Sequence, residues 1–233
     1  MIKILTVFSR LLDYPTVALV EHKNEICEAI KVSPYLPPEL REKLVEEVEW
    51  ALSQDLYEQE MRYDGLFDRG RTTSLLLFEH IHGESRDRGQ AMVDLLNLYF
   101  DAGMQPRKDE LPDYLPLFLE FLATRDDEVA RDLLFDVSEI LQLLYLRLQK
   151  KQAWEAMIFE ALLIIAGAPV GDETLATKVQ QELDDASLDA LDIAWEDKEI
   201  RFDNQLDNAC PKTFVQAAKN LSDVPIHWHG NRS

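Results

Sequence analysis

The chain has 233 residues, of which 46% are hydrophobic and 29% charged, so it can bury a core and does not have a disordered composition. Acidic residues outnumber basic ones 44 to 24, which gives a formal net charge of -20. This excess argues against nucleic acid as the main partner and against docking on an anionic membrane, because both require a basic face. Only 8 glycines are present, which disfavours folds built on glycine-rich phosphate loops. Two cysteines, Cys27 and Cys210, are too few for a disulfide framework or a multi-cysteine metal site.

Apolar residues recur at helical spacing through nearly the whole chain, and no alternating pattern flanked by hairpin turns is found. The first helix, from Met1 to Leu12, has an apolar stripe that ends at Asp13-Tyr14-Pro15, and it lacks the unbroken apolar run of a signal peptide. A long stripe from Leu133 to Leu148 and the helix Trp154 to Ala166 are expected to form the central pair of a bundle. Other helices are predicted over residues 16–31, 38–53, 56–67, 73–81, 85–102, 113–124, 173–185, 188–203 and 212–221.

These elements predict an all-α fold, a single-domain bundle of about ten helices over residues 1–222 with a loose tail over 223–233. No stretch approaches the roughly 18 uninterrupted apolar residues that a membrane span requires. The most apolar stretch, Ala156 to Ala166, contains Glu160 and is expected to be a buried helix. We therefore expect a cytoplasmic protein that is not inserted in a membrane.

Charge is distributed unevenly along the chain. Residues 39–60 hold 8 acids and 2 bases, and residues 172–209 hold 12 acids and 3 bases. Residues 66–92 hold 4 of each. The acidic helices are interpreted either as a solvated surface or as a surface that attracts a basic partner.

The neutral segment contains two similar clusters, Asp68-Arg69-Gly70-Arg71 and Arg86-Asp87-Arg88-Gly89. They bracket a short predicted helix that Thr72 to Ser74 can cap and Gly83 can end. In one interpretation the arginines form ion pairs with neighbouring acids and hold the loops against the bundle. In the other they form a recognition surface, because guanidinium groups bind carboxylates or phosphates in a bidentate way.

His80 and His82, with Glu79 and Glu84 nearby, raise the question of a metal site. Their i, i+2 spacing directs them to different faces of a helix, so hydrogen bonding and loop packing are the expected roles. The same spacing recurs at His227 and His229 in the tail, where a functional metal site is not expected. No phosphate-loop motif, nucleophile elbow or catalytic cysteine motif is found, so the protein is predicted to be no enzyme and to carry no metal or cofactor.

A second notable stretch runs from Glu110 to Leu122. Pro112 and Pro116 suit the first turn of a helix, and Asp113 can act as its N-cap. Apolar residues surround most of this helix. It is interpreted either as a core helix or as the wall of a groove that holds a partner's amphipathic helix.

These segments carry a resemblance to a known family. Leu66 to Met92 and Glu110 to Leu122 closely resemble the assembly chaperones of respiratory nitrate reductase, the NarJ and NarW family, which is also called the delta subunit. Residues 9–15, Ser-Arg-Leu-Leu-Asp-Tyr-Pro, and 190–196, Ala-Leu-Asp-Ile-Ala-Trp-Glu, match as well, so the resemblance covers most of the chain.

The resemblance implies an all-helical cytoplasmic chaperone, like the wider TorD and DmsD group. Such a chaperone binds the N-terminal segment of the apo catalytic (alpha) subunit, supports insertion of the molybdenum cofactor and delays docking on the membrane anchor. Proteins that deliver the molybdenum cofactor are a further partner class. A cofactor-handling protein that itself binds a phosphate-bearing pterin is the alternative function, and a stable subunit of the membrane complex is a third.

The resemblance also implies where the partner binds. Leu66-Phe67 match a pair in the family's groove helix, and residues 110–114 resemble an acidic-Pro-Asp-His motif beside the groove, with Tyr114 where a histidine is common. Asp68 and Asp113 are expected at the acidic rim. The residues expected at the partner interface are Leu66, Phe67, Asp68, Arg69, Arg71, Glu79, His80, His82, Glu84, Arg86, Asp87, Arg88, Asp113, Tyr114, Leu117 and Phe118.

Overall fold

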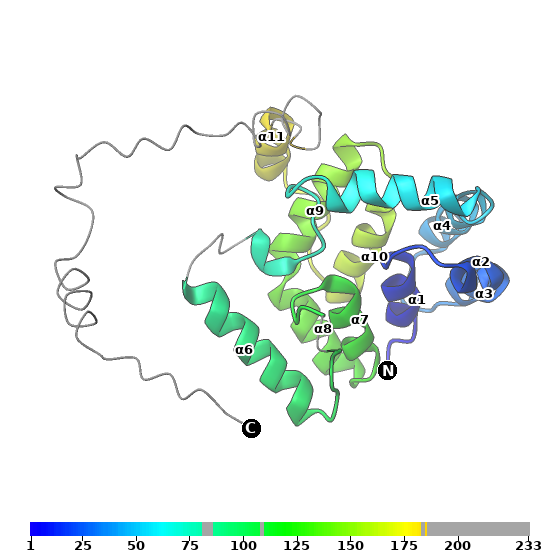
Figure 1. The fold of residues 1–233 in the computed structure, drawn as a ribbon. Coiled ribbons are helices and arrows are strands. Elements are labelled where there is room, and N and C mark those ends of the chain that lie inside the picture. Colours follow the sequence, from blue (N-terminus) through cyan, green and yellow to red (C-terminus); the bar gives the residue numbers. More distant parts are fainter. Residues whose placement is uncertain (81–85, 108–109, 183–184, 186–233) are drawn as a thin grey trace, which may run out of the picture. The chain divides into compact units, whose positions relative to one another are not determined.

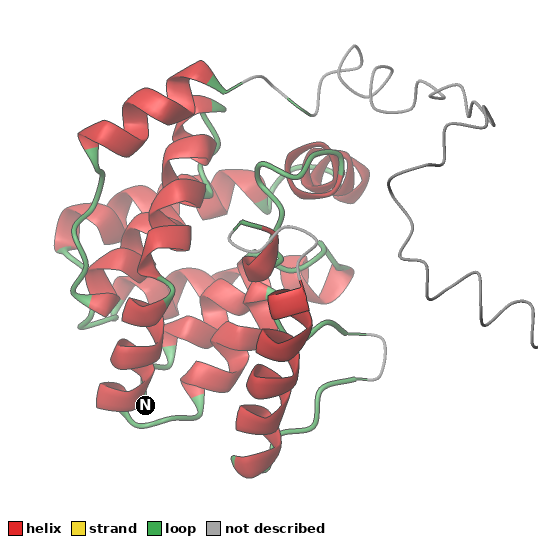
Figure 2. Ribbon diagram, turned by 90° about the vertical axis from the view of Figure 1, so that its left-hand side faces the viewer, coloured by secondary structure: helices red, strands yellow, loops and turns green. Residues whose placement is uncertain are grey.

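The computed structural model describes residues 1–80, 86–107, 110–182 and 185, and these residues form eleven α-helices and no strand (Figures 1 and 2). The all-α prediction is confirmed. The helices are α1 Ile4–Leu11, α2 Val17–Glu21, α3 Lys23–Lys31, α4 Pro38–Ala51, α5 Leu56–Tyr63, α6 Arg86–Asp101, α7 Leu115–Ala123, α8 Asp127–Asp136, α9 Ser138–Lys150, α10 Ala156–Ala166 and α11 Glu173–Gln181. A π-helical turn, η1 Asp64–Asp68, and a 3-10 turn, η2 Leu77–Glu79, complete the regular elements.

The N-terminal helix α1 packs against α7, beside which it lies in Figure 1. The apolar stripe of α1 buries Leu5 and Phe8 completely. Nearly all side chains of α7 are buried, which is why this helix is apolar on every side. The Ser9 hydroxyl donates a hydrogen bond to the Pro116 carbonyl at 2.7 Å and joins the two helices at a polar point.

The central pair of the bundle is α9 and α10, as the apolar stripes predicted. The single long helix expected before Trp154 is, however, divided into α8 and α9 by Val137, whose φ of -100° and ψ of 8° leave the helical region. The break allows both halves to pack against α10. Gly167 ends α10 in the left-handed conformation with φ of 71°, which glycine adopts at little cost.

Two other predicted helices differ in the structure. The helix over residues 16–31 is divided at His22, whose ring nitrogen Nδ1 lies 2.8 Å from the Ala18 carbonyl. Residues 73–81 were predicted as a helix, and this is wrong for the described residues up to 80, which contain only the 3-10 turn η2.

The chain before η2 is extended because a distant segment pairs with it. Leu76 forms an isolated antiparallel bridge with Tyr114. The Leu77 N–H donates to the Asp113 carbonyl at 2.9 Å, and the Leu115 N–H donates to the Leu75 carbonyl at 2.8 Å. These long-range bonds replace the local bonds of a helix, so the two stretches that carry the resemblance lie side by side.

Helix α5 begins with Asp55, whose carboxylate accepts a hydrogen bond from the Tyr57 N–H at 3.0 Å. It continues directly into the π-helical turn η1, which contains Gly65. The wider turn places Leu66 and Phe67 in the core. Single π-helical turns of this kind are rare and frequently occur at functional sites.

All described residues belong to one compact unit, Met1–Ala194. The predicted helices 188–203 and 212–221, and the predicted tail over 223–233, lie outside the described residues. Within the described part of the chain, no helix combines the length and the apolar character needed to cross a bilayer.

Candidate functional site

Three segments that carry the resemblance meet at Tyr114. Its hydroxyl donates a hydrogen bond to Asp13 Oδ1 at 3.0 Å and lies 3.0 Å from the Tyr63 hydroxyl. The Tyr63 ring packs against Tyr14 and Phe67, each with ring centroids 5.2 Å apart. Burial raises the pKa of Tyr63 to about 12 and also raises the pKa of Tyr114, so both phenols are neutral at physiological pH.

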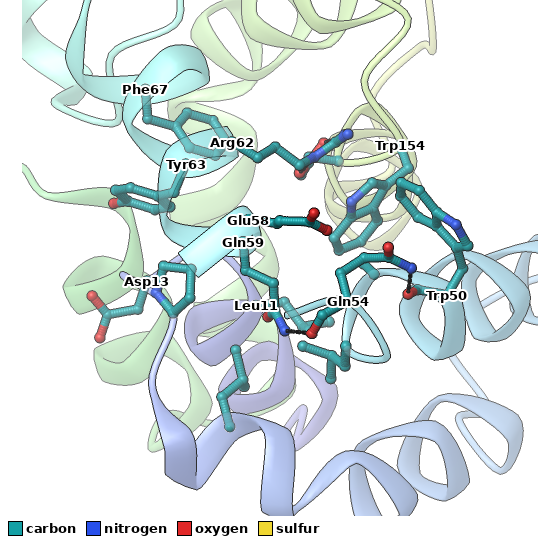
Figure 3. Close-up of a pocket in the computed structure, with 15 residues that line it drawn as sticks. Leu11, Asp13, Trp50, Gln54, Glu58, Gln59, Arg62, Tyr63, Phe67 and Trp154 are labelled. Atoms are coloured by element: carbon teal, nitrogen blue, oxygen red, sulfur yellow. Dashed lines mark hydrogen bonds and ion pairs between the residues drawn. The ribbon is translucent and has the colours of Figure 1, made fainter. Parts of the chain in front are cut away.

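A pocket with a volume of about 190 Å³ lies on one side of this aromatic cluster, and we call it the tryptophan pocket (Figure 3). Figure 3 shows Trp50 and Trp154 side by side at one end of it, and Tyr63 and Phe67 at the other. Its walls come from α1, α2, α4, α5, η1, the segments that connect them and the two residues before α10. The lining residues are Leu11, Asp13, Pro15, Leu19, Trp50, Ala51, Leu52, Gln54, Glu58, Gln59, Arg62, Tyr63, Phe67, Trp154 and Glu155.

One ion pair and two indole rings define the polar character of the tryptophan pocket. Arg62 binds Glu155 in a bidentate way, with Nε and Nη2 at 3.1 and 2.9 Å from the two carboxylate oxygens. The Arg62 guanidinium also lies 5.8 Å from the centre of the Trp50 ring. Trp154 Nε1 is buried without a hydrogen-bond partner among the described residues. Glu58 is exposed and forms no ion pair with any described residue.

A second pocket, of about 400 Å³, lies on the other side of Tyr63 and Phe67, and we call it the arginine pocket. It brings together six of the residues predicted from the sequence at the partner interface. These are Phe67, Asp68, Arg69, Arg71, Glu79 and Tyr114, and the remaining lining residues are Tyr63, Gly70, Ser74, Leu75 and Leu76. The tryptophan and arginine pockets share Tyr63 and Phe67, so they adjoin each other at the aromatic cluster, and we refer to the two pockets together as the groove.

Acidic residues lie near the aromatic cluster, and we call Glu60, Asp64 and Asp68 the ridge acids. Burial and the carboxylates of these three acids raise the pKa of the Tyr14 phenol, so their charges act on its hydroxyl. None of the three forms an ion pair with another described residue. Burial, and then Asp64, also raises the pKa of Asp68. The exposed ring of Tyr14 and the surrounding carboxylates therefore suit a cationic side chain.

His80 has an internal role. Its Nε2 lies 2.8 Å from the Ser74 carbonyl and must carry the proton, and its Nδ1 accepts a hydrogen bond from Arg147 at 3.2 Å. Burial lowers the pKa of His80, so the ring is neutral. Both nitrogens are thus used within the fold, which agrees with the predicted packing role and leaves neither for a metal or a partner.

Asp113 is fully buried, so the prediction that it lies at an exposed rim is wrong. It is not the N-cap of α7 either, because its Oδ2 accepts a hydrogen bond from the Phe78 N–H at 3.1 Å. Burial raises the pKa of Asp113. Arg88 lies 3.7 Å from Glu79 and 4.0 Å from Asp113, so the second arginine cluster reaches the arginine pocket through Glu79.

Several predicted groove residues belong to the core. Leu66, Leu117 and Phe118 are buried and line neither pocket. The core interpretation of α7 therefore holds, and the groove wall expected there is replaced by Tyr63, Phe67 and Tyr114. His82 and Glu84 lie outside the described residues, as do the side chains of Arg86 and Asp87, whose backbone begins α6.

The tryptophan pocket was not predicted from the sequence. Trp50 and Arg62 are not among the residues expected at the partner interface, although Arg62 lies on the predicted helix that carries Leu66 and Phe67. Trp154 and Glu155 begin a helix that was read only as core. The signal that was available is a pair of tryptophans next to loops, Trp50 near the end of α4 and Trp154 just before α10. Their meeting depends on contacts between residues about 90 positions apart, which no local pattern reveals.

The chain is similar to proteins of one known family. The family model described as nitrate reductase delta subunit matches residues 33–151. The chain is 45% identical over 213 residues, 91% of this chain and 89% of the relative, to the nitrate reductase molybdenum cofactor assembly chaperone NarJ of Escherichia coli K12. It is 40% identical over 89% of its length, and 87% of the relative, to the probable chaperone NarW of the same organism. A probable NarJ of Bacillus subtilis is 34% identical over 54% of this chain and 68% of the relative.

Proposed function

The chain belongs to the nitrate reductase delta subunit family, and from this membership we propose that it is a molybdenum cofactor assembly chaperone for a respiratory nitrate reductase. We further propose that it binds the apo catalytic (alpha) subunit through that subunit's N-terminal segment. In this proposal it supports cofactor insertion, delays docking on the membrane, works in the cytoplasm and catalyses no reaction. Proteins that deliver the molybdenum cofactor are proposed as a further partner class.

The groove formed by the tryptophan and arginine pockets carries this proposal. Its two pockets are separated by Tyr63 and Phe67, so one amphipathic segment has a place for an apolar side chain on each side. Each large apolar side chain that is fully buried there contributes about 1.5–3 kcal/mol of transfer free energy.

Charge complementarity supports an amphipathic segment that also carries basic residues. Glu58 and the ridge acids Glu60, Asp64 and Asp68 have no cationic partner among the described residues. Such acids orient a basic segment and speed its association more than they raise its affinity. Because these acids act mainly on orientation and association rate, we expect added salt to weaken binding only modestly.

The test is calorimetry with the full chain and a synthetic peptide that carries the N-terminal segment of the cognate catalytic subunit. The variant Trp50→Ala removes a wall of the tryptophan pocket, and Tyr57→Ala on the neighbouring helix α5 is its matched control. Both side chains are at least half exposed, but only Trp50 lines the groove. Truncating an interface tryptophan costs about 2 kcal/mol, or roughly thirtyfold in affinity, and the control should bind like the wild type. Absence of binding to the wild-type chain would contradict the proposal.

The arginine pocket is tested in the same way. Arg69→Ala removes an exposed guanidinium that lines this pocket, and Arg107→Ala removes an exposed one that does not. We expect the affinity for the peptide to fall about threefold in Arg69→Ala and to stay unchanged in Arg107→Ala, because an exposed charge contributes under about 1 kcal/mol. The pterin-binding alternative is not favoured by the contacts of the described residues, because His80 is engaged internally and Arg88 faces two carboxylates.

A further inference from the structure

The carboxylate of Asp185 is bound by the backbone of the loop that borders the arginine pocket. Its Oδ2 accepts hydrogen bonds from the N–H groups of Arg71 at 2.6 Å and Thr72 at 2.9 Å, and its Oδ1 accepts one from the Thr72 hydroxyl at 2.6 Å. Two successive N–H groups directed at one anion form a backbone nest. Burial alone would raise the pKa of Asp185, but these hydrogen bonds outweigh it and lower that pKa.

The Arg147 side chain on α9 binds the same loop at the backbone carbonyl of Thr72. Its Nη1 donates to the Thr72 carbonyl at 2.9 Å, while Nε and Nη2 donate to the two carboxylate oxygens of Glu182 at 2.8 and 2.6 Å. Lys150, one turn further along α9, donates to carbonyl oxygens at the end of α11 at distances of 2.7 to 3.2 Å. The N–H, hydroxyl and carbonyl groups of Thr72 are therefore all bound by residues remote in sequence.

Gly70 leaves room for this approach of Asp185. A Cβ atom at position 70 would lie 2.6 Å from Asp185 Oδ1 and 2.9 Å from its Cγ, which is closer than van der Waals contact allows. Gly70 and Arg71 line the arginine pocket, whereas Asp185 and Arg147 do not. The loop thus lies between the pocket and the groups that hold it.

We propose that Asp185 and Arg147 are positioning residues for partner binding, because they hold the Arg69–Thr72 loop in the shape that forms the polar wall of the arginine pocket. A second connection from Arg147 to this wall runs through His80 to Ser74, which also lines the pocket. The shape of the pocket therefore depends on Asp185, a residue more than 100 positions further along the chain. This inference rests on the proposed function of the groove.

The experiment compares the full chain with Asp185→Ala, which removes the carboxylate, and with Gly70→Ala, which displaces it and keeps every charge. Glu173→Ala removes an exposed acid on α11 and is the matched control. Calorimetry with the catalytic-subunit peptide should show binding about three- to tenfold weaker in the first two variants, as expected for the loss of one or two hydrogen bonds, and unchanged in the control. Without peptide, hydrogen exchange at the Arg71 and Thr72 amides should be faster in the first two variants only.

The outcomes separate the inference from the proposed function. If the wild type binds the peptide and both variants bind equally well, the inference is overturned and the proposed function stands. Unchanged amide exchange in Asp185→Ala also overturns it, because the loop then does not depend on this carboxylate. If the wild type binds no peptide, the proposed function itself fails.

Discussion

The two halves of the groove are built in different ways. The tryptophan pocket is lined largely by side chains of helices that pack on the core, and the ion pair Arg62–Glu155 joins two of those helix regions. The polar wall of the arginine pocket is the Arg69–Thr72 loop, which is held by two groups distant in sequence, Arg147 and Asp185. A pocket made by helix packing is rigid as long as the core is intact, whereas a pocket made by a loop is as rigid as its hydrogen bonds.

The largest effect is expected where the two pockets share a wall. Phe67→Ala removes a ring that is buried in the core and lines both pockets. We expect the free energy of unfolding to fall by about 3 kcal/mol, because a cavity replaces a packed aromatic side chain. Urea unfolding measures this loss, and Phe100→Ala, where the ring is about half exposed on α6, should change stability by less than about 0.5 kcal/mol.

A smaller loss is expected from the ion pair of the tryptophan pocket. Arg62→Ala leaves the buried Glu155 carboxylate without its partner, which should cost about 2 kcal/mol, less than for a fully buried pair because Arg62 is partly exposed. Adding Glu155→Gln should restore part of this loss, since a neutral amide needs no counter-charge. Equal stability of the single and double variants would show that the pair does not support this pocket.

Trp154→Phe should have a smaller effect still. The change leaves a void, but it also removes a buried indole N–H that has no partner among the described residues, and such a donor costs about 1–3 kcal/mol. These effects oppose each other, so we expect a net change in unfolding free energy below about 1 kcal/mol. A loss of several kcal/mol in urea unfolding would indicate that the N–H group is satisfied in solution.

The smallest effect expected is a difference in pH dependence between Asp113 and Asp185, two carboxylates that accept hydrogen bonds from backbone N–H groups near the arginine pocket. The pKa of Asp113 is raised, so its charge costs stability at neutral pH, and this cost disappears as the pH falls toward the ordinary Asp value of about 3.9. The pKa of Asp185 is lowered, so it contributes stability above that value and loses it as the pH falls through its folded pKa.

Urea unfolding from about pH 7 to pH 3 measures this difference. Asp113→Asn should remove the rise in the free energy of unfolding that protonation of Asp113 produces as the pH falls. Asp185→Asn should remove the decrease in that free energy that protonation of Asp185 produces. Asp101→Asn, an exposed acid at the end of α6, is the control for removing one charge. Shifts of the same sign in the two variants would contradict the contrast between the two carboxylates.

Local patterns predicted most helices but not the segments between them. The stripe in residues 1–12 and the pattern in 85–102 correspond closely to α1 and α6. The helix predicted over 73–81 failed because its backbone groups bond to Asp113 and Leu115, almost 40 residues later. Likewise, Leu117 and Phe118 look like groove residues in sequence, and only the packing of α1 against α7 decides that they are core.

The sequence by itself determined the all-α class and the central pair α9–α10, and its family resemblance grouped the Arg69–Arg71 cluster with Glu79 and Tyr114, which line one pocket in the structure. The tertiary structure decided which of those residues face the groove, and it revealed the tryptophan pocket and the contacts of Asp185. The physical reason is the sequence distance between the residues that determine each feature. A helix depends on residues three or four positions apart, whereas a pocket wall depends on side chains and backbone groups that packing brings together from distant parts of the chain.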